Sequence, residues 1–154
     1  LSFGATKGGA MAAEAVVFFD PAIADTMHER RKRGGHLLSK HRFLAAQFEA
    51  FLHEGLWLRL AHHANAMADR LAEVLRAADL PPVWPVEANL VFALLPEAVD
   101  AKLKAAGAAY YVREPDRLPV GIAAAPTDRL ARFVTSFATR EDEIARLAEL
   151  LQKR

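Results

Sequence analysis

The chain opens with a lysine set among small residues, Leu1-Ser2-Phe3-Gly4-Ala5-Thr6-Lys7-Gly8-Gly9-Ala10-Met11. Glycine has no Cβ, so this backbone can turn tightly and let a ligand approach the main chain. A lysine in such surroundings can form a Schiff base with a carbonyl compound, above all pyridoxal phosphate, when its pKa falls enough to leave a neutral amine. The alternative is a surface lysine in a flexible turn, and the motif by itself leaves both open.

A phosphate-binding nucleotide loop is excluded by the order of residues. Such a loop needs its lysine directly after a glycine and directly before Ser or Thr, so that backbone N–H groups wrap the phosphates. Here Thr6 precedes Lys7 and Gly8 follows it.

The composition is that of a globular protein, with 53% hydrophobic and 25% charged residues among 154. The net charge of +1, from 20 basic and 19 acidic residues, gives no electrostatic reason to expect a nucleic acid or an anionic membrane as partner. The chain has no cysteine, which excludes disulfides, thiolate metal sites and cysteine catalysis and favours a cytoplasmic protein. No run approaches the roughly 18 apolar residues of a membrane span, so we expect a soluble protein.

Residues 1–34 are expected to contain two strands and a helix. The chain begins on what reads as the end of a strand, so we expect sequence upstream of Leu1 to supply a sheet. Residues 15–19 read as a fully buried strand. Asp20 and Pro21 then predict the N-cap and first position of a helix that ends at Gly34, after the basic cluster of residues 30–33. That cluster fits either C-terminal helix capping or contacts with phosphate or carboxylate groups.

Apolar spacing predicts two further helices, over residues 36–52 and 56–78. Prolines at 81, 82 and 85 then mark the boundary of a second subdomain. After it the pattern predicts an α+β unit, with Thr139 as N-cap of a last helix. The other expected elements are a strand over residues 89–95, a helix over 96–106 and strands over 109–113 and 130–137.

Arg132 is the second candidate functional residue. Alternation in its strand puts Arg132, Val134 and Ser136 on one face. An arginine at mid-strand is costly to bury unless a carboxylate or phosphate meets its donors, and a substrate anion is one such partner. A surface arginine on an edge strand is the alternative, and Arg129 is a rival. The six histidines form no convincing metal site, because neighbours such as His62 and His63 point about 100° apart on a helix.

Several stretches in order resemble the low-specificity threonine aldolases of the β-eliminating lyase/threonine aldolase family, which are pyridoxal-phosphate enzymes of the aspartate-aminotransferase fold type. The resemblance covers nearly the whole chain and corresponds to the C-terminal portion of the family. The stretches are SFGATKGG (2–9), AEAVVFF (13–19), RRKRGGHL (30–37), SKHRFLAA (39–46), PVEAN (85–89) and ARF (131–133).

The resemblance implies a partial α/β fold of type I, the class of pyridoxal-phosphate-dependent transferases. Residues 1–53 would end the large cofactor domain with its linking helices, residues 54–80 would form a connecting helix, and residues 81–154 a small α+β domain. Lys7 would be the Schiff-base lysine and Arg132 would hold the substrate α-carboxylate. Cofactor contacts are also implied for Thr6, for Lys32, and for Ser39 and Lys40, the last two next to a position that reaches the cofactor phosphate of a neighbouring subunit.

The function implied is cleavage of L-threonine, L-allo-threonine or related β-hydroxy-α-amino acids to glycine and an aldehyde, by a homo-oligomer, dimeric or tetrameric, with pyridoxal phosphate. The alternatives are a related β-eliminating lyase and a non-catalytic oligomerisation or binding fragment. The chain departs from the family pattern at Ala5, where glycine is usual, and at Gly8, where asparagine is frequent. The family's ring-stacking histidine and pyridine-pairing acid precede the lysine, outside this sequence, so the chain alone is expected to be inactive.

Overall fold

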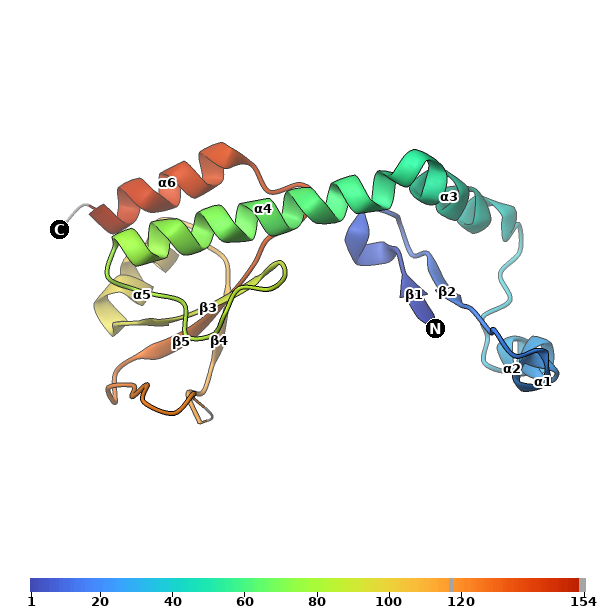
Figure 1. The fold of residues 1–154 in the computed structure, drawn as a ribbon, viewed down its shortest axis with the longest axis horizontal. Helices are drawn as coiled ribbons and strands as arrows, with labels where there is room; N and C mark the ends of the chain where they lie inside the picture. The colour runs from blue at the N-terminus through green and yellow to red at the C-terminus, as the bar shows by residue number, and fades with distance from the viewer. Residues whose placement is uncertain (117, 153–154) are drawn as a thin grey trace. The chain divides into compact units, whose positions relative to one another are not determined.

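The computed structural model describes residues 1–116 and 118–152, which fall into two compact units that meet in the sequence between Leu60 and Ala61. The first unit contains the lysine turn, and the second contains a three-stranded sheet with helices (Figure 1). The domain boundaries expected after residues 53 and 80 stay a prediction. No helix within the described residues has the length and apolar character needed to cross a membrane.

The first unit begins with an antiparallel ribbon of two short strands, β1 (Ser2–Gly4) and β2 (Glu14–Val16). The short 3-10 helix η1 (Thr6–Gly8) lies in the connection between them. The connection is closed at its base by the Ala5 N–H, which donates to the Ala13 carbonyl over 2.9 Å. The lysine turn is therefore held at both ends by the ribbon.

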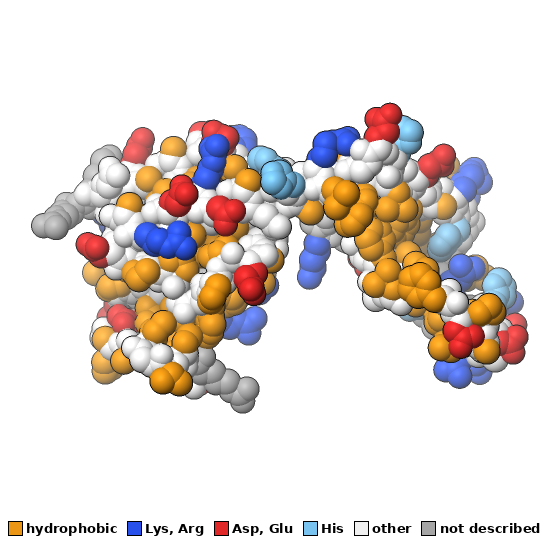
Figure 2. Space-filling view, in the orientation of Figure 1, with side chains coloured by type: hydrophobic (Ala, Val, Ile, Leu, Met, Phe, Trp, Pro, Cys, Tyr) orange, Lys and Arg blue, Asp and Glu red, His pale blue; other side chains and the backbone are white. Residues whose placement is uncertain are grey.

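The prediction of a fully buried strand over residues 15–19 is wrong. Strand β2 ends at Val16, whose surface is 63% exposed, and Phe19 is 82% exposed. Hydrophobic side chains consequently lie on the surface of the first unit (Figure 2). A two-stranded ribbon has neither further strands nor a second layer to cover such a run, which is why its apolar composition does not lead to burial in this chain.

The helix predicted after Asp20 is present but interrupted. Asp20 Oδ1 accepts the Ala22 N–H over 2.9 Å, so the predicted N-cap is confirmed. The helix then breaks into α1 (Pro21–Ala24) and α2 (Met27–Arg33) because Thr26 leaves the helical conformation. Thr26 is the N-cap residue of α2, with a φ of −99° and a ψ of 8°, and its Oγ1 accepts a hydrogen bond from Arg30 Nε over 3.2 Å.

Two consecutive helices follow. Helix α3 (Arg42–Leu52) begins six residues later than expected, after a segment in which Lys40 has a φ of 56°. The short 3-10 turn η2 (His53–Gly55) joins it to α4, with Glu54 and Gly55 both at positive φ. Helix α4 (Leu56–Ala77) ends within one residue of its predicted position.

The second unit is built on an antiparallel sheet of order β3-β5-β4. Strand β5 (Arg129–Val134) is central and pairs with β3 (Leu90–Leu95) and β4 (Tyr111–Arg113). Its register places Phe133 opposite Val91 and Ala131 opposite Ala93. Because side chains alternate along a strand, these residues share one face and Arg132 lies on the other.

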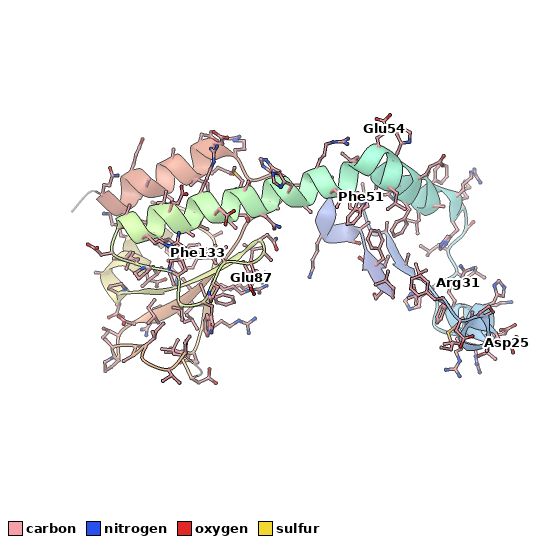
Figure 3. All side chains as sticks on the ribbon, viewed as in Figure 1. Asp25, Arg31, Phe51, Glu54, Glu87 and Phe133 are labelled. Atoms are coloured by element: carbon pink, nitrogen blue, oxygen red, sulfur yellow. The ribbon has the colours of Figure 1, made fainter. Side chains whose placement is uncertain are left out.

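Three helices supply the second half of the core: α4, α5 (Glu97–Ala105) and α6 (Glu141–Gln152) (Figure 1). Phe133 lies between the sheet and this helical layer (Figure 3). The buried side chains of the cluster are Ala68, Leu71, Ala72, Leu75, Val91, Ala93, Leu95, Leu103, Ala131 and Phe133. Phe92, Leu130 and Arg132 lie on the other sheet face, because side chains alternate along each strand.

The last helix starts one residue later than the cap prediction requires. Helix α6 follows Arg140, whose N–H donates to Glu143 Oε2 over 2.8 Å, so Thr139 is not its N-cap. Thr139 Oγ1 instead accepts the Ser136 N–H over 2.9 Å and closes the turn after β5. The strands predicted over residues 109–113 and 130–137 are both shorter in the structure.

Candidate active site

Lys7 lies at the centre of the η1 turn, with its side chain exposed. The Gly8 and Ala10 N–H groups both donate to the Ala5 carbonyl over 3.0 Å, which fixes the turn, and Gly9 has a φ of 128° that a residue with a Cβ rarely adopts. Within residues 1–116 and 118–152, Lys7 Nζ has no ion-pair or hydrogen-bond partner. The amine is therefore accessible to a ligand.

The neighbours of Lys7 pack tightly beneath the turn. Ala5 is fully buried in one cluster with Phe51, which lies near the end of α3 (Figure 3). The φ of Ala5, −104°, suits alanine as well as glycine. A Cβ on Gly8 would lie 2.9 Å from Phe51 Cζ, so the ring occupies the space that a side chain there would need. Both departures from the family pattern are thus accommodated in the packing around Lys7.

Thr6 forms a hydrogen bond within the lysine turn, whereas the other predicted cofactor contacts have no bond to that turn among the described residues. The Thr6 hydroxyl donates to the Ala13 carbonyl over 3.3 Å, which leaves its oxygen as an acceptor. Lys32 on α2, and Ser39 and Lys40 before α3, have exposed side chains. No hydrogen bond or ion pair among the described residues joins Lys32, Ser39 or Lys40 to the lysine turn. Their roles stay predictions.

Arg132 occupies the middle of β5, opposite Phe92 of β3 and Tyr111 of β4. Its guanidinium carbon lies 5.5 Å from the centre of the Tyr111 ring, within the range of a cation–π contact. Trp84 packs edge-on against Phe92 with the ring centres 5.2 Å apart. The arginine is therefore flanked by aromatic rings on both neighbouring strands.

An open depression of about 530 Å³ lies on this sheet face, lined by Trp84, Phe92, Arg113, Glu114, Asp116, Leu130 and Arg132. Arg132 is partly buried and forms no ion pair with any acid in the part of the chain that the structure describes. Arg129, its rival from the sequence, pairs instead with Glu97 over 3.4 Å. Arg132 is thus the arginine of β5 whose charge is still available to an incoming anion.

Sequence reasoning missed the residues around Arg132. Trp84, Phe92 and Tyr111 come from three segments, and their meeting depends on a strand pairing that spans up to 40 residues, since Phe92 pairs with Arg132. The available signal was the strand alternation itself, which places Tyr111 and Arg113 on one face of β4. The order of the strands in the sheet could not be read from it.

A second polar cluster lies away from this depression, where α5 meets the segment before β4. Asp100 is buried and accepts hydrogen bonds from Tyr110 Oη over 2.7 Å and from Lys104 Nζ over 2.8 Å. Burial raises the pKa of Asp100, but the two bonds together with the positive charges of Lys104 and Arg129 outweigh it and hold the pKa below its usual value. Burial and the bond to Asp100 raise the pKa of Tyr110 well above its usual value. These groups stabilise the fold.

The histidines are dispersed, and no group of three metal-ligating side chains occurs within the described residues. His63 Nε2 lies 2.7 Å from the Thr139 carbonyl and links α4 to the turn before α6.

Comparison with known proteins gives related sequences and a related structure, although no family model matches the chain. A low specificity L-threonine aldolase of Pseudomonas aeruginosa is 45% identical over 114 residues, which are 72% of this chain and 32% of that protein. One from Pseudomonas sp. strain NCIMB 10558 is 37% identical over 151 residues, 96% of this chain and 40% of that protein. A structure of Leishmania major threonine aldolase is 30% identical with a TM-score of 0.88, covering 99% of this chain and 42% of that one.

The fold is a partial α/β fold of the type I pyridoxal-phosphate enzymes, as the sequence predicts. Within that class the chain is related to the low-specificity L-threonine aldolases and corresponds to their C-terminal portion. It spans between about a third and two fifths of the length of the two Pseudomonas relatives.

Proposed function

We propose that the full-length protein cleaves L-threonine, L-allo-threonine and related β-hydroxy-α-amino acids to glycine and an aldehyde with pyridoxal phosphate as cofactor. The observation that carries the proposal is the alignment of 96% of this chain with a relative named low specificity L-threonine aldolase. Two features support it: the amine of Lys7 is exposed and has no partner among the described residues, and the charge of Arg132 is available, because the reaction needs a covalent anchor and a carboxylate-binding group.

Lys7 fits the role of covalent anchor for the cofactor. Its amine is exposed on a turn that is fixed by backbone hydrogen bonds, and Gly8 and Gly9, the two residues after it, add no side chain of their own beside the amine. When bound, pyridoxal phosphate supplies the electron sink that cleavage of the Cα–Cβ bond requires. Lys7 Nζ would hold it at a defined position relative to the turn.

Arg132 fits the role of substrate anchor. A guanidinium presents a planar fork of donors that can meet both oxygens of an α-carboxylate. Held on a central strand, Arg132 would fix one end of the amino acid and so orient the Cα–Cβ bond. The β-hydroxyl then loses its proton as the aldehyde C=O forms, and Cα gains a proton to give glycine.

We further propose that the protein acts as a homo-oligomer in which Lys32, Ser39 and Lys40 contact the cofactor, the last two next to a position that reaches the cofactor phosphate of a neighbouring subunit. All three side chains are exposed, and two of them carry positive charge. Exposed lysines of this kind can meet a phosphate with little loss of existing contacts.

Product analysis tests the reaction class. The purified full-length protein with pyridoxal phosphate and L-threonine is expected to release glycine and acetaldehyde in equal amounts. Release of ammonia and a 2-oxo acid in place of glycine would assign the protein to the β-eliminating lyases. Absence of both products, with the protein folded and saturated with cofactor, would favour a non-catalytic module.

Substitution of Lys7 tests the covalent anchor independently of turnover. Borohydride reduction of the wild-type protein with bound cofactor is expected to add the cofactor mass to the peptide that contains Lys7. Lys7→Arg keeps the positive charge but cannot form the covalent bond, so it should lose both this label and cleavage activity. A label on another peptide, or unchanged turnover in Lys7→Arg, would refute the assignment.

A further inference from the structure

We propose that Tyr111 is a positioning residue for Arg132, whose guanidinium its ring holds ready for a carboxylate. The inference rests on the proposed function, because it takes Arg132 to be the group that binds the substrate α-carboxylate. Nothing in the sequence resemblance points to Tyr111. Its role follows from the pairing of β4 with β5, which sets Tyr111 directly opposite Arg132.

The geometry of the pair is that of a cation held over an aromatic face. The Arg132 guanidinium carbon lies 5.5 Å from the Tyr111 ring centre. On the other side of β5, Phe92 faces Arg132, and Trp84 packs against Phe92. Side chains directly opposite each other in an antiparallel sheet lie close enough to restrict one another's rotamers, so the arginine has rings on both sides.

The choice of an aromatic neighbour has a chemical reason. An acid paired with an arginine occupies the donors that a substrate carboxylate would use, as Glu97 does for Arg129. A ring attracts the guanidinium through its face while leaving the edge donors available. Although Glu114 and Asp116 also line the depression, neither forms an ion pair with Arg132 within the described chain. Tyr111 thus orients the charge without consuming it.

The test compares substitutions that keep or remove the ring. In the full-length protein, Tyr111→Leu removes the ring and should raise both the KM for L-threonine and the calorimetric Kd for glycine by about two- to five-fold, with kcat within about two-fold of wild type. Tyr111→Phe keeps the ring and should match wild type. Since Tyr111 is 63% exposed, we expect these variants to fold. If Tyr111→Leu does not fold, Tyr111→Met also removes the ring and should raise the KM and the Kd by the same factor.

Matched variants separate this inference from the proposed function. Val112→Ala alters the next residue of β4, whose side chain lies on the opposite face, and should leave both constants unchanged. Arg132→Lys should raise the KM more than Tyr111→Leu does, because it loses the bidentate fork.

If Arg132→Lys raises the KM but Tyr111→Leu does not, or if Tyr111→Phe is as impaired as Tyr111→Leu, the positioning role is refuted. If Arg132→Lys also leaves the KM and the glycine Kd unchanged, the carboxylate-binding role itself fails.

Discussion

Arg129 and Arg132 show how a separation of three residues on one strand decides what an arginine can do. An odd separation puts the two side chains on opposite faces of β5. Arg129 forms an ion pair with Glu97 of α5, whereas Arg132 lies against the Tyr111 ring on the face that carries the depression. The sequence nominates both residues, and the strand register distinguishes them.

At the lysine turn, the packing of Gly8 against Phe51 gives a residue-scale prediction. A Cβ at position 8 would meet Phe51 Cζ at 2.9 Å, and Phe51 is buried. Overpacking costs about 1 to 3 kcal/mol, while replacing glycine with alanine gains about 0.4 to 1 kcal/mol by restricting the unfolded chain. The overpacking term is larger, so Gly8→Ala should lower the free energy of unfolding by about 1 kcal/mol in denaturant titrations followed by Trp57 fluorescence in a Trp84→Phe background.

The control for this prediction is a double-mutant cycle. Phe51→Leu removes the ring atom that a Cβ at position 8 would meet, so Gly8→Ala in that background should be neutral or slightly stabilising. An equal cost of Gly8→Ala in both backgrounds would show that the ring is not the cause.

At the scale of elements, local sequence patterns predict the helices and strands. They do not predict burial correctly where it depends on residues far away in the sequence. The period of α4 and the Gly107 that follows α5 place those helices within about one residue of their observed ends. The apolar run of residues 15–19 predicts a buried strand just as clearly, but its burial would require neighbouring strands, which a local pattern does not reveal. Likewise, Lys7 and Arg132 could be nominated from the sequence, whereas the aromatic neighbours of Arg132 depend on non-local pairing.

The junction between α5 and β4 gives a prediction for the pH dependence of stability. The pKa of Asp100 is below its usual value in the folded state, so its stabilising contribution is present above about pH 4 and is lost as pH falls through the folded value. The pKa of Tyr110 is above its usual value, so its contribution is present below about pH 10 and is lost as pH rises toward the folded value. Denaturant titrations across pH should therefore show a decline on both sides.

Tyr110→Phe removes the hydroxyl that donates to Asp100 and should lower the free energy of unfolding at neutral pH by about 1 to 2 kcal/mol. It should also abolish the part of the alkaline decline that belongs to Tyr110. Tyr111→Phe removes the chain's other tyrosine hydroxyl and is the matched control. An alkaline decline of the same size in Tyr110→Phe and wild type would contradict this account.

At the scale of the whole molecule, buried apolar side chains are distributed unequally between the two units. The cluster of the second unit joins the sheet to α4 and α5 through ten buried residues, and partly buried side chains of α6 pack against it. That of the first unit joins three buried residues, Ala5, Ala13 and Phe51, to partly buried aromatics such as Phe3 and Trp57. Because free energy of local opening follows the apolar area that an element buries, the two units should differ in local stability.

Hydrogen exchange followed by mass spectrometry checks this difference on residues 1–154. Strand β5 is paired on both sides, and its residues Leu130, Ala131 and Phe133 are buried, so its amides should exchange slowest. The β1–β2 ribbon has two strands only, and Val16 within it and Phe19 after it are exposed. Its amides should therefore exchange at least about tenfold faster, which corresponds to about 1.4 kcal/mol of local opening. The β5 amides in the same sample are the internal control. Equal protection of the ribbon and of β5 would mean that the first unit gains stability from contacts other than its own three-residue core.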